Sequence, residues 1–91
     1  LGSVTKSLVL YVLNNNPKRT ASEIEKIIDI TDIGRRVHSS LILLLKKREI
    51  VHEGEKGNLR YSITPRGKQI ISEYLDRYGH VAKVFGYVKK N

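Results

Sequence analysis

The stretch IVHEGEKGNLRYSITPRGK, residues 50–68, predicts a β-hairpin that is followed directly by a helix. The run IVH is β-prone, and the run RYSI alternates polar with apolar side chains as a half-buried strand does. Gly54 and Gly57 bracket a charged tip between these two runs. Thr64 followed by Pro65 indicates a helix start, because threonine is a good N-cap and proline is tolerated in the first helical turn.

Three helical segments are predicted before this hairpin. Residues 4–13 are apolar on nearly every side, which fits a helix buried in a core or in a dimer interface. Thr20 and Glu23 match the capping box, in which a hydroxyl and a carboxylate satisfy each other's backbone donors at the start of a helix. Residues 29–32 read as a turn with two N-cap candidates, and a third helix is expected over residues 33–48.

This third helix has one apolar and one basic face. The buried face is defined by four apolar residues at helical spacing, Val37, Leu41, Leu44 and Leu45. The opposite face carries Arg35, Arg36, Ser39, Leu43, Lys46 and Lys47. A fourth helix is expected over residues 65–78, and the tail beyond it reads as a short helix or an extended arm.

Positive charge is concentrated in the middle of the chain. The 91 residues carry a net charge of +8, and residues 34–68 hold nine of the seventeen basic residues and three of the nine acidic ones, a local balance of 9 − 3 = +6. Such a field favours a polyanionic partner, and nucleic acid is the commonest one inside cells. An anionic membrane surface is the competing interpretation.

Composition argues against several other classes of protein. The chain has no cysteine, which excludes disulfides and thiolate metal sites, and His38, His52 and His80 do not have metal-ligand spacing. There is no glycine-rich phosphate loop, so we expect a protein that is not an enzyme and has no cofactor or metal. No apolar run reaches the roughly 18 residues of a membrane span and no signal-peptide pattern opens the chain. We therefore expect an intracellular, cytoplasmic and nucleoid-associated protein.

The order helix, helix, helix, strand, strand, helix resembles the winged helix-turn-helix domain. The blocks LKKREIV at residues 45–51 and YSITPRGK at residues 61–68 are similar to the recognition-helix exit and post-wing segment of MarR-like and PadR-like regulators, and small winged-helix proteins of archaea and their viruses look alike too. The expected fold class is mainly α with a small β-hairpin: a three-helix core, a two-stranded wing and a C-terminal helix. Glu49 departs from the pattern, because these families usually have a glycine there that lets the helix exit in a left-handed conformation.

The resemblance implies a double-stranded DNA-binding transcriptional regulator whose third helix enters the major groove while the wing reaches the adjacent minor groove or backbone. Groove-facing candidates lie near the start of that helix and are Arg35, Arg36, His38, Ser39 and Ser40. Candidate phosphate contacts are Lys46, Lys47, Thr20 and Ser22, with Lys56, Asn58 and Arg60 on the wing. Because Glu53 and Glu55 flank the wing tip and repel phosphate, we expect the wing to contribute less to binding than the helix.

The chain is expected to divide into three parts, and the resemblance also implies a homodimer. Residues 1–3 look like the remnant of a cleaved tag, residues 4–78 form the DNA-binding domain, and residues 79–91 form an extension suited to dimerisation. The candidate interface residues are Leu8, Tyr11, Tyr74, Tyr78, Val81, Val84 and Phe85. A monomeric domain of a larger chain is the alternative.

Each candidate residue also has a purely structural interpretation. Arg35 and Arg36 could be a solvated face, Thr20 and Ser22 simple helix caps, and the tyrosines packing residues. Two other functions compete with a regulator. One is a winged-helix module of a replication, segregation or repair protein that binds DNA with little sequence preference, and the other is a winged helix that binds protein through Leu43 and the apolar tail.

Overall fold

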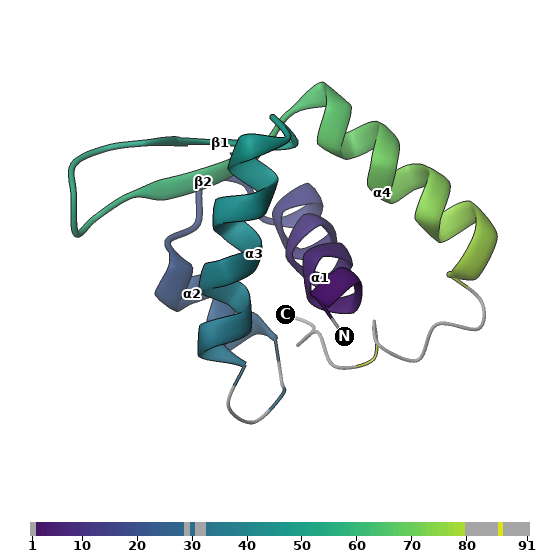
Figure 1. Ribbon diagram of the computed structural model, residues 1–91, viewed down its shortest axis with the longest axis horizontal. Helices are drawn as coiled ribbons and strands as arrows, with labels where there is room; N and C mark the ends of the chain where they lie inside the picture. Colours follow the sequence, from purple (N-terminus) through teal and green to yellow (C-terminus); the bar gives the residue numbers. More distant parts are fainter. Residues whose placement is uncertain (1, 29, 31–32, 80–85, 87–91) are drawn as a thin grey trace.

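The computed structural model describes residues 2–28, 30, 33–79 and 86, and its elements follow the predicted order (Figure 1). Helices α1 (Gly2–Asn15), α2 (Ala21–Ile27) and α3 (Gly34–Lys46) precede strands β1 (Ile50–Glu53) and β2 (Arg60–Ile63) and helix α4 (Pro65–Tyr78). A mainly helical chain with a small antiparallel β-hairpin is therefore confirmed. The expectations for the turn at 29 and 31–32 and for the tail at 80–85 and 87–91 lie outside the described residues.

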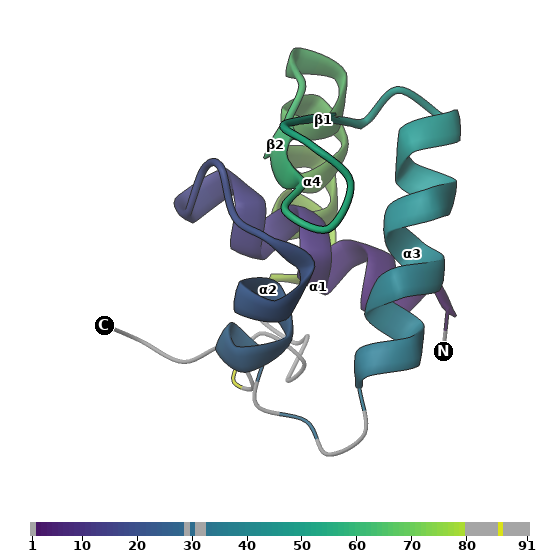
Figure 2. The same ribbon diagram turned by 90° about the vertical axis from the view of Figure 1, so that its left-hand side faces the viewer.

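Helix α1 is the central element of the fold. It contacts α2, α3, β2 and α4, and the two views of Figures 1 and 2 show it enclosed by the other helices and the hairpin. Its side chains are buried on nearly every side, at Leu8, Val9, Leu10, Val12 and Leu13. Burying one such aliphatic side chain contributes about 1.5–3 kcal/mol. Leu8, expected at a dimer interface, is fully buried within the single chain and has no surface left to offer a partner.

The predicted capping box opens α2. The Oγ1 atom of Thr20 accepts a hydrogen bond from the backbone N–H of Glu23 at 3.2 Å, and Oε1 of Glu23 accepts one from the backbone N–H of Thr20 at 2.9 Å. Helix α3 begins differently, because its N-cap residue is Ile33, which provides no side-chain cap. The start of α3 is fixed by burial of Ile33 and Val37 in the core instead.

Helix α3 ends two residues before the predicted Arg48, and its exit differs from the expected one. Arg48, and not Glu49, adopts the left-handed conformation, with φ of 59°. The backbone N–H of Arg48 donates to the carbonyl of Leu45, and that of Glu49 donates to the carbonyl of Leu44, which is the Schellman pattern. The departure noted at Glu49 is thus accommodated by placing the left-handed residue one position earlier.

The β-hairpin is short, and one residue outside it forms an isolated β-bridge with β2. Ile50 pairs with Ile63 and Glu53 with Arg60 in an antiparallel register. Arg19, from the loop between α1 and α2, exchanges two backbone hydrogen bonds with Tyr61 at 2.8 and 3.1 Å. The base of the hairpin is therefore fixed to the helical core, while its tip projects beyond α2 (Figure 1).

The start of α4 is attached to the exit of α3. Thr64 caps α4 by accepting from the backbone N–H of Gly67 at 3.1 Å, and its hydroxyl donates to the carbonyl of Arg48 at 2.8 Å. The backbone N–H of Thr64 donates to the carbonyl of Glu49 at 3.0 Å. The predicted start at Thr64 and Pro65 is confirmed, and Ile71 then buries one face of α4 in the core.

Candidate nucleic-acid interface

The outer face of α3 carries basic and small polar side chains. Val37, Leu41 and Leu44 are buried and hold the inner face of the helix in the core. The exposed side chains on the other side are Arg35, Arg36, His38, Ser39, Ile42, Leu43, Lys46 and Lys47. In Figure 1 this helix lies beside α1, and in Figure 2 it forms one edge of the molecule. A rigid helix thus presents basic and small polar groups outward.

The structure separates the two serines that the sequence placed together. Ser39 is exposed on the outer face, whereas Ser40 is only 3% exposed and lies on the inner side of the helix. The two positions differ by about 100° on a helix, which moves Ser40 onto the buried side. The expectation that Ser40 faces a groove therefore does not agree with its burial.

The cations of this face are unpaired in the part of the chain that the structure describes. No ion pair there engages Arg35, Arg36, Lys46 or Lys47, while the described ion pairs use other basic residues. The helix itself contains no acidic residue. The carboxylate of Glu25 lies beside Gly34, at the positive end of the helix dipole. The Glu25 carboxylate therefore offsets the dipole at this end, and the available positive charge of α3 comes from its exposed arginine and lysine side chains.

The hairpin tip has mixed charge, as the sequence predicts. Lys56 and Asn58 are exposed, and the backbone N–H of Asn58 donates to the carbonyl of Glu55 at 2.9 Å to close the turn. Gly54 has a φ of +100°, and a Cβ there would lie 2.8 Å from the Asn58 carbonyl oxygen. Glu53 is 3.9 Å from Lys18, but both side chains are well exposed, so this pair contributes at most about 1 kcal/mol.

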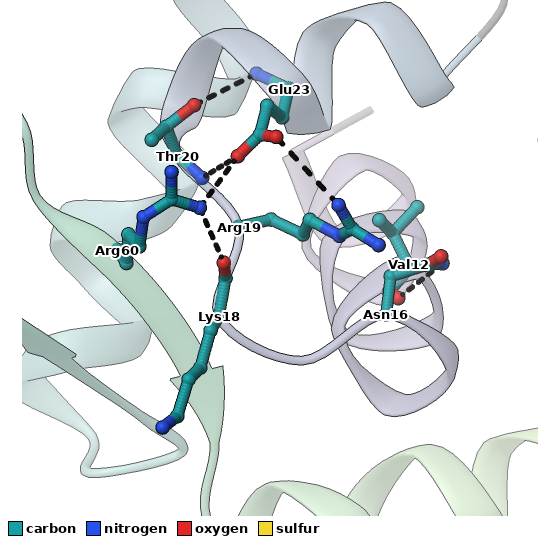
Figure 3. Close-up of polar contacts among 7 residues, drawn as sticks. All are labelled: Val12, Asn16, Lys18, Arg19, Thr20, Glu23 and Arg60. Atoms are coloured by element: carbon teal, nitrogen blue, oxygen red, sulfur yellow. Dashed lines mark hydrogen bonds and ion pairs between the residues drawn. The ribbon is translucent and has the colours of Figure 1, made fainter.

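Arg60 is engaged within the protein and is not a free donor. Its Nη1 donates to the Lys18 carbonyl at 2.9 Å and to Oε1 of Glu23 at 3.1 Å (Figure 3). Arg19 approaches Oε2 of the same carboxylate at 3.7 Å. Glu23 therefore lies between two guanidinium groups that come from the α1–α2 loop and from β2. This arrangement connects the hairpin to the start of α2.

The same cluster changes the ionisation of Glu23. Its pKa is lowered from the ordinary value, chiefly by the hydrogen bond from the Thr20 backbone N–H, then by the Thr20 side chain and the charges of Arg60 and Arg19, while desolvation acts in the opposite direction. The hydroxyl and the backbone N–H of Thr20 both form hydrogen bonds in the capping box, which matches the interpretation of Thr20 as a helix cap. Ser22 is exposed on α2.

The candidate dimer residues fall into three groups. Leu8 is in the core, and Tyr11 and Tyr74 are half-buried against it. Tyr78 is 48% exposed, and its ring packs against that of Tyr74 with a centroid distance of 5.1 Å. The predictions for Val81, Val84 and Phe85 lie outside the described residues. A shallow pocket on α4 is lined by Ile70, Glu73, Tyr74, Arg77 and Tyr78.

Sequence reasoning missed Ile42 and the cluster around Glu23. Ile42 is 49% exposed on the outer face of α3, and the signal was present, because it lies seven residues after Arg35 and four before Lys46. The contact between Arg60 and Glu23 spans 37 residues of sequence, and no local pattern indicates it. The contact of Arg60 with Glu23 could therefore not be predicted from the sequence.

The residues that the structure describes contain no cluster of three or more histidine, aspartate or glutamate side chains arranged to hold a metal ion. None of their helices is both long and apolar enough to pass through a bilayer. No protein-family model matches this chain, and no curated protein sequence matches it significantly. The case for a function therefore rests on the geometry of α3 and the hairpin.

Proposed function

We propose that this protein is a winged-helix transcriptional regulator that binds double-stranded DNA, with α3 in the major groove and the hairpin on the adjacent backbone or minor groove. The observation that carries the proposal is the outer face of α3, where four exposed cations have no internal partner among the described residues. Cations without internal partners can neutralise phosphates and release counterions without first breaking a salt bridge.

The dimensions of α3 suit this role. Its 13 residues span about 20 Å, and the major groove, about 12 Å wide, admits an α-helix. Arg35 and Arg36 lie in its first turn, and a guanidinium can bridge O6 and N7 of guanine. Lys46 and Lys47 lie in or just after its last turn, where a flexible ammonium fits a phosphate better than a base edge. The two ends of the face thus take different roles.

The hairpin has a secondary role in this proposal. Lys56 and Asn58 are its available donors, since Arg60 is held by Glu23 and the Lys18 carbonyl. The carboxylates of Glu53 and Glu55 weaken its field near phosphate. We infer that Arg60 orients the hairpin and that Lys56 makes the backbone contact.

Action as a homodimer is part of the proposal. The outer face of α4 supports it, because Ile70 and Tyr78 remain 36% and 48% exposed and line one shallow pocket. A two-fold dimer would present two α3 helices to half-sites about one turn of DNA apart.

The experiment is duplex binding followed by fluorescence anisotropy, using sites selected from a random pool and a series of salt concentrations. Arg35→Ala or Arg36→Ala should cost about 1–3 kcal/mol and relax the base preference. Lys46→Ala should weaken all sequences alike and reduce the salt slope by about 0.9. Lys26→Ala, on α2, is the control for loss of one exposed charge.

Three outcomes would count against the proposal. Absence of duplex binding at moderate salt removes it altogether. If Lys26→Ala and Lys46→Ala change the salt dependence of DNA affinity equally, binding depends on the net charge of the protein and not on the outer face of α3. Loss of binding in proportion to the mass of random competitor duplex would favour the alternative of a DNA-binding module with little sequence preference.

A further inference from the structure

We propose that Ile42 reads the C5-methyl group of a thymine in the DNA site bound by α3. The inference rests on the proposed DNA binding and deepens it, because it specifies a base that the arginines do not read. Arginine pairs with guanine, whereas the thymine methyl is recognised by apolar contact in the major groove.

Ile42 lies in the middle of the outer face. At about 100° per residue, Arg35, Ser39, Ile42 and Lys46 project within about 60° of one another. Ile42 is 49% exposed, and the exposed side chains one or two turns away are polar or cationic, namely Arg35, His38, Ser39 and Lys46. A ligand that lies along α3 and is bound by Arg35 and Lys46 must therefore pass over Ile42.

The combination of charges and apolar groups decides which ligand fits. Single exposed apolar residues are common, but here Ile42 and its neighbour Leu43, which is 44% exposed, lie among four cations without internal partners in the described chain. The major groove of duplex DNA combines phosphates on its rims with thymine methyl groups on its floor. It offers a partner to both kinds of side chain at once.

An anionic membrane is the other polyanion with apolar groups, and the packing of α3 disfavours it. A helix that lies in a membrane surface inserts a broad apolar face. The broad apolar face of α3 carries Val37, Leu41 and Leu44, which are buried within the protein. Of the large apolar side chains of this helix, only Ile42 and Leu43 are exposed, which is too few for stable insertion.

Helix geometry predicts where the thymine lies. Ile42 follows Arg35 by seven residues, a rise of about 10.5 Å. This rise equals about three base steps of 3.4 Å along the DNA axis, and a helix that follows the inclined groove advances along that axis by less than its own length. We therefore expect the thymine within about three base pairs of the guanine that Arg35 contacts.

The experiment replaces each thymine of the selected site by uracil, which removes the methyl group alone. Replacement of the thymine that Ile42 contacts should weaken binding about fourfold, because burying one methylene-sized group contributes about 0.8 kcal/mol. Ile42→Ala should bind thymine and uracil sites equally well. Val51→Ala removes an exposed β-branched residue from the hairpin and should keep the full discrimination. Circular dichroism checks that each variant is folded.

The outcomes separate this inference from the proposed function. Duplex binding without any uracil effect would overturn the inference and leave the proposed function standing, whereas absence of duplex binding would remove both. A uracil effect that persists in Ile42→Ala would assign the methyl to another residue and overturn the role of Ile42. Binding to phosphatidylserine vesicles that depends on Ile42, in preference to duplex DNA, would also overturn it.

Discussion

Glu23 connects three segments of the chain through a single carboxylate. It completes the capping box with Thr20, and it accepts from Arg60 on β2 while Arg19 lies nearby (Figure 3). The groups are partly exposed, so solvent weakens each charge pair. The value of the cluster is geometric, because it fixes where the hairpin leaves the core.

The lowered pKa of Glu23 predicts a pH dependence of stability. A carboxyl group whose pKa is lower in the folded state contributes stability that is present above the unfolded-state pKa and is lost as the pH falls through the folded-state pKa. Glu23→Gln keeps the capping-box acceptor but does not titrate. The variant should be less stable than the wild type at neutral pH, and the difference should shrink in acid. Urea unfolding monitored by circular dichroism measures both.

The matched control is Glu55→Gln, which removes an exposed carboxylate from the hairpin tip, outside the cluster. Its unfolding free energy should follow the wild type across the pH range. If the Glu23→Gln variant loses as much stability in acid as the wild type does, the Glu23 cluster is not a source of the pH dependence.

The cluster also marks the limit of what single residues reveal in sequence. The capping box was predictable, because Thr20 and Glu23 are three residues apart and act on the same helix turn. The choice of Arg60 as partner was not, because it depends on how β2 is placed against the α1–α2 loop. The local sequence of β2 therefore predicts Arg60 as a DNA contact, since nothing in that strand indicates its partner Glu23.

At the level of elements, the junction of α3, the hairpin and α4 explains the motif TPRGK. The hydroxyl of Thr64 donates a hydrogen bond to the carbonyl of Arg48 and accepts one from the backbone N–H of Gly67. The backbone of Gly67 also lies close to the carbonyl of Glu49. Glycine is needed at position 67 because of this close approach, and its φ is not in the left-handed region. The order of elements was readable from local signals, while the close approach was not.

Gly67→Ala should therefore destabilise the protein by about 1–3 kcal/mol, the usual cost of forcing an extra group into a packed site. A Cβ at this position would overlap the carbonyl oxygen of Glu49 and the side chain of Ile63. Chemical unfolding gives the free energy. Lys68→Ala, an exposed change in the same turn, should be within about 0.5 kcal/mol of the wild type. If Gly67→Ala leaves the free energy of unfolding unchanged, the junction of α3 and α4 can accommodate the extra methyl group without strain.

At the scale of the whole molecule, α1 takes the core position and leaves α4 on the outside. The sequence allowed either a core or a dimer interface for residues 4–13, since an all-apolar helix fits both. Burial of α1 within one chain covers most of its apolar side chains, and in the described part of the chain α4 keeps Ile70 and Tyr78 exposed as a surface for a second copy. Only the packed structure could decide which helix was covered, because periodicity states how apolar a face is and not what covers it.

The proposed dimer therefore predicts a concentration-dependent mass that depends on α4 and not on α1 or the hairpin. Tyr78→Ala removes an aromatic side chain that is 48% exposed, and such residues commonly contribute more than about 1 kcal/mol to an interface. Because a two-fold dimer carries the change on both subunits, sedimentation equilibrium should show the dimer dissociation constant rising about tenfold or more in this variant. Val51→Ala, on β1, should leave it unchanged. If the wild-type protein stays monomeric at every concentration used, the alternative of a monomeric DNA-binding domain is favoured. Such a monomer inserts one α3 helix, so the selected DNA should then show a single site and no pair of half-sites at a fixed spacing.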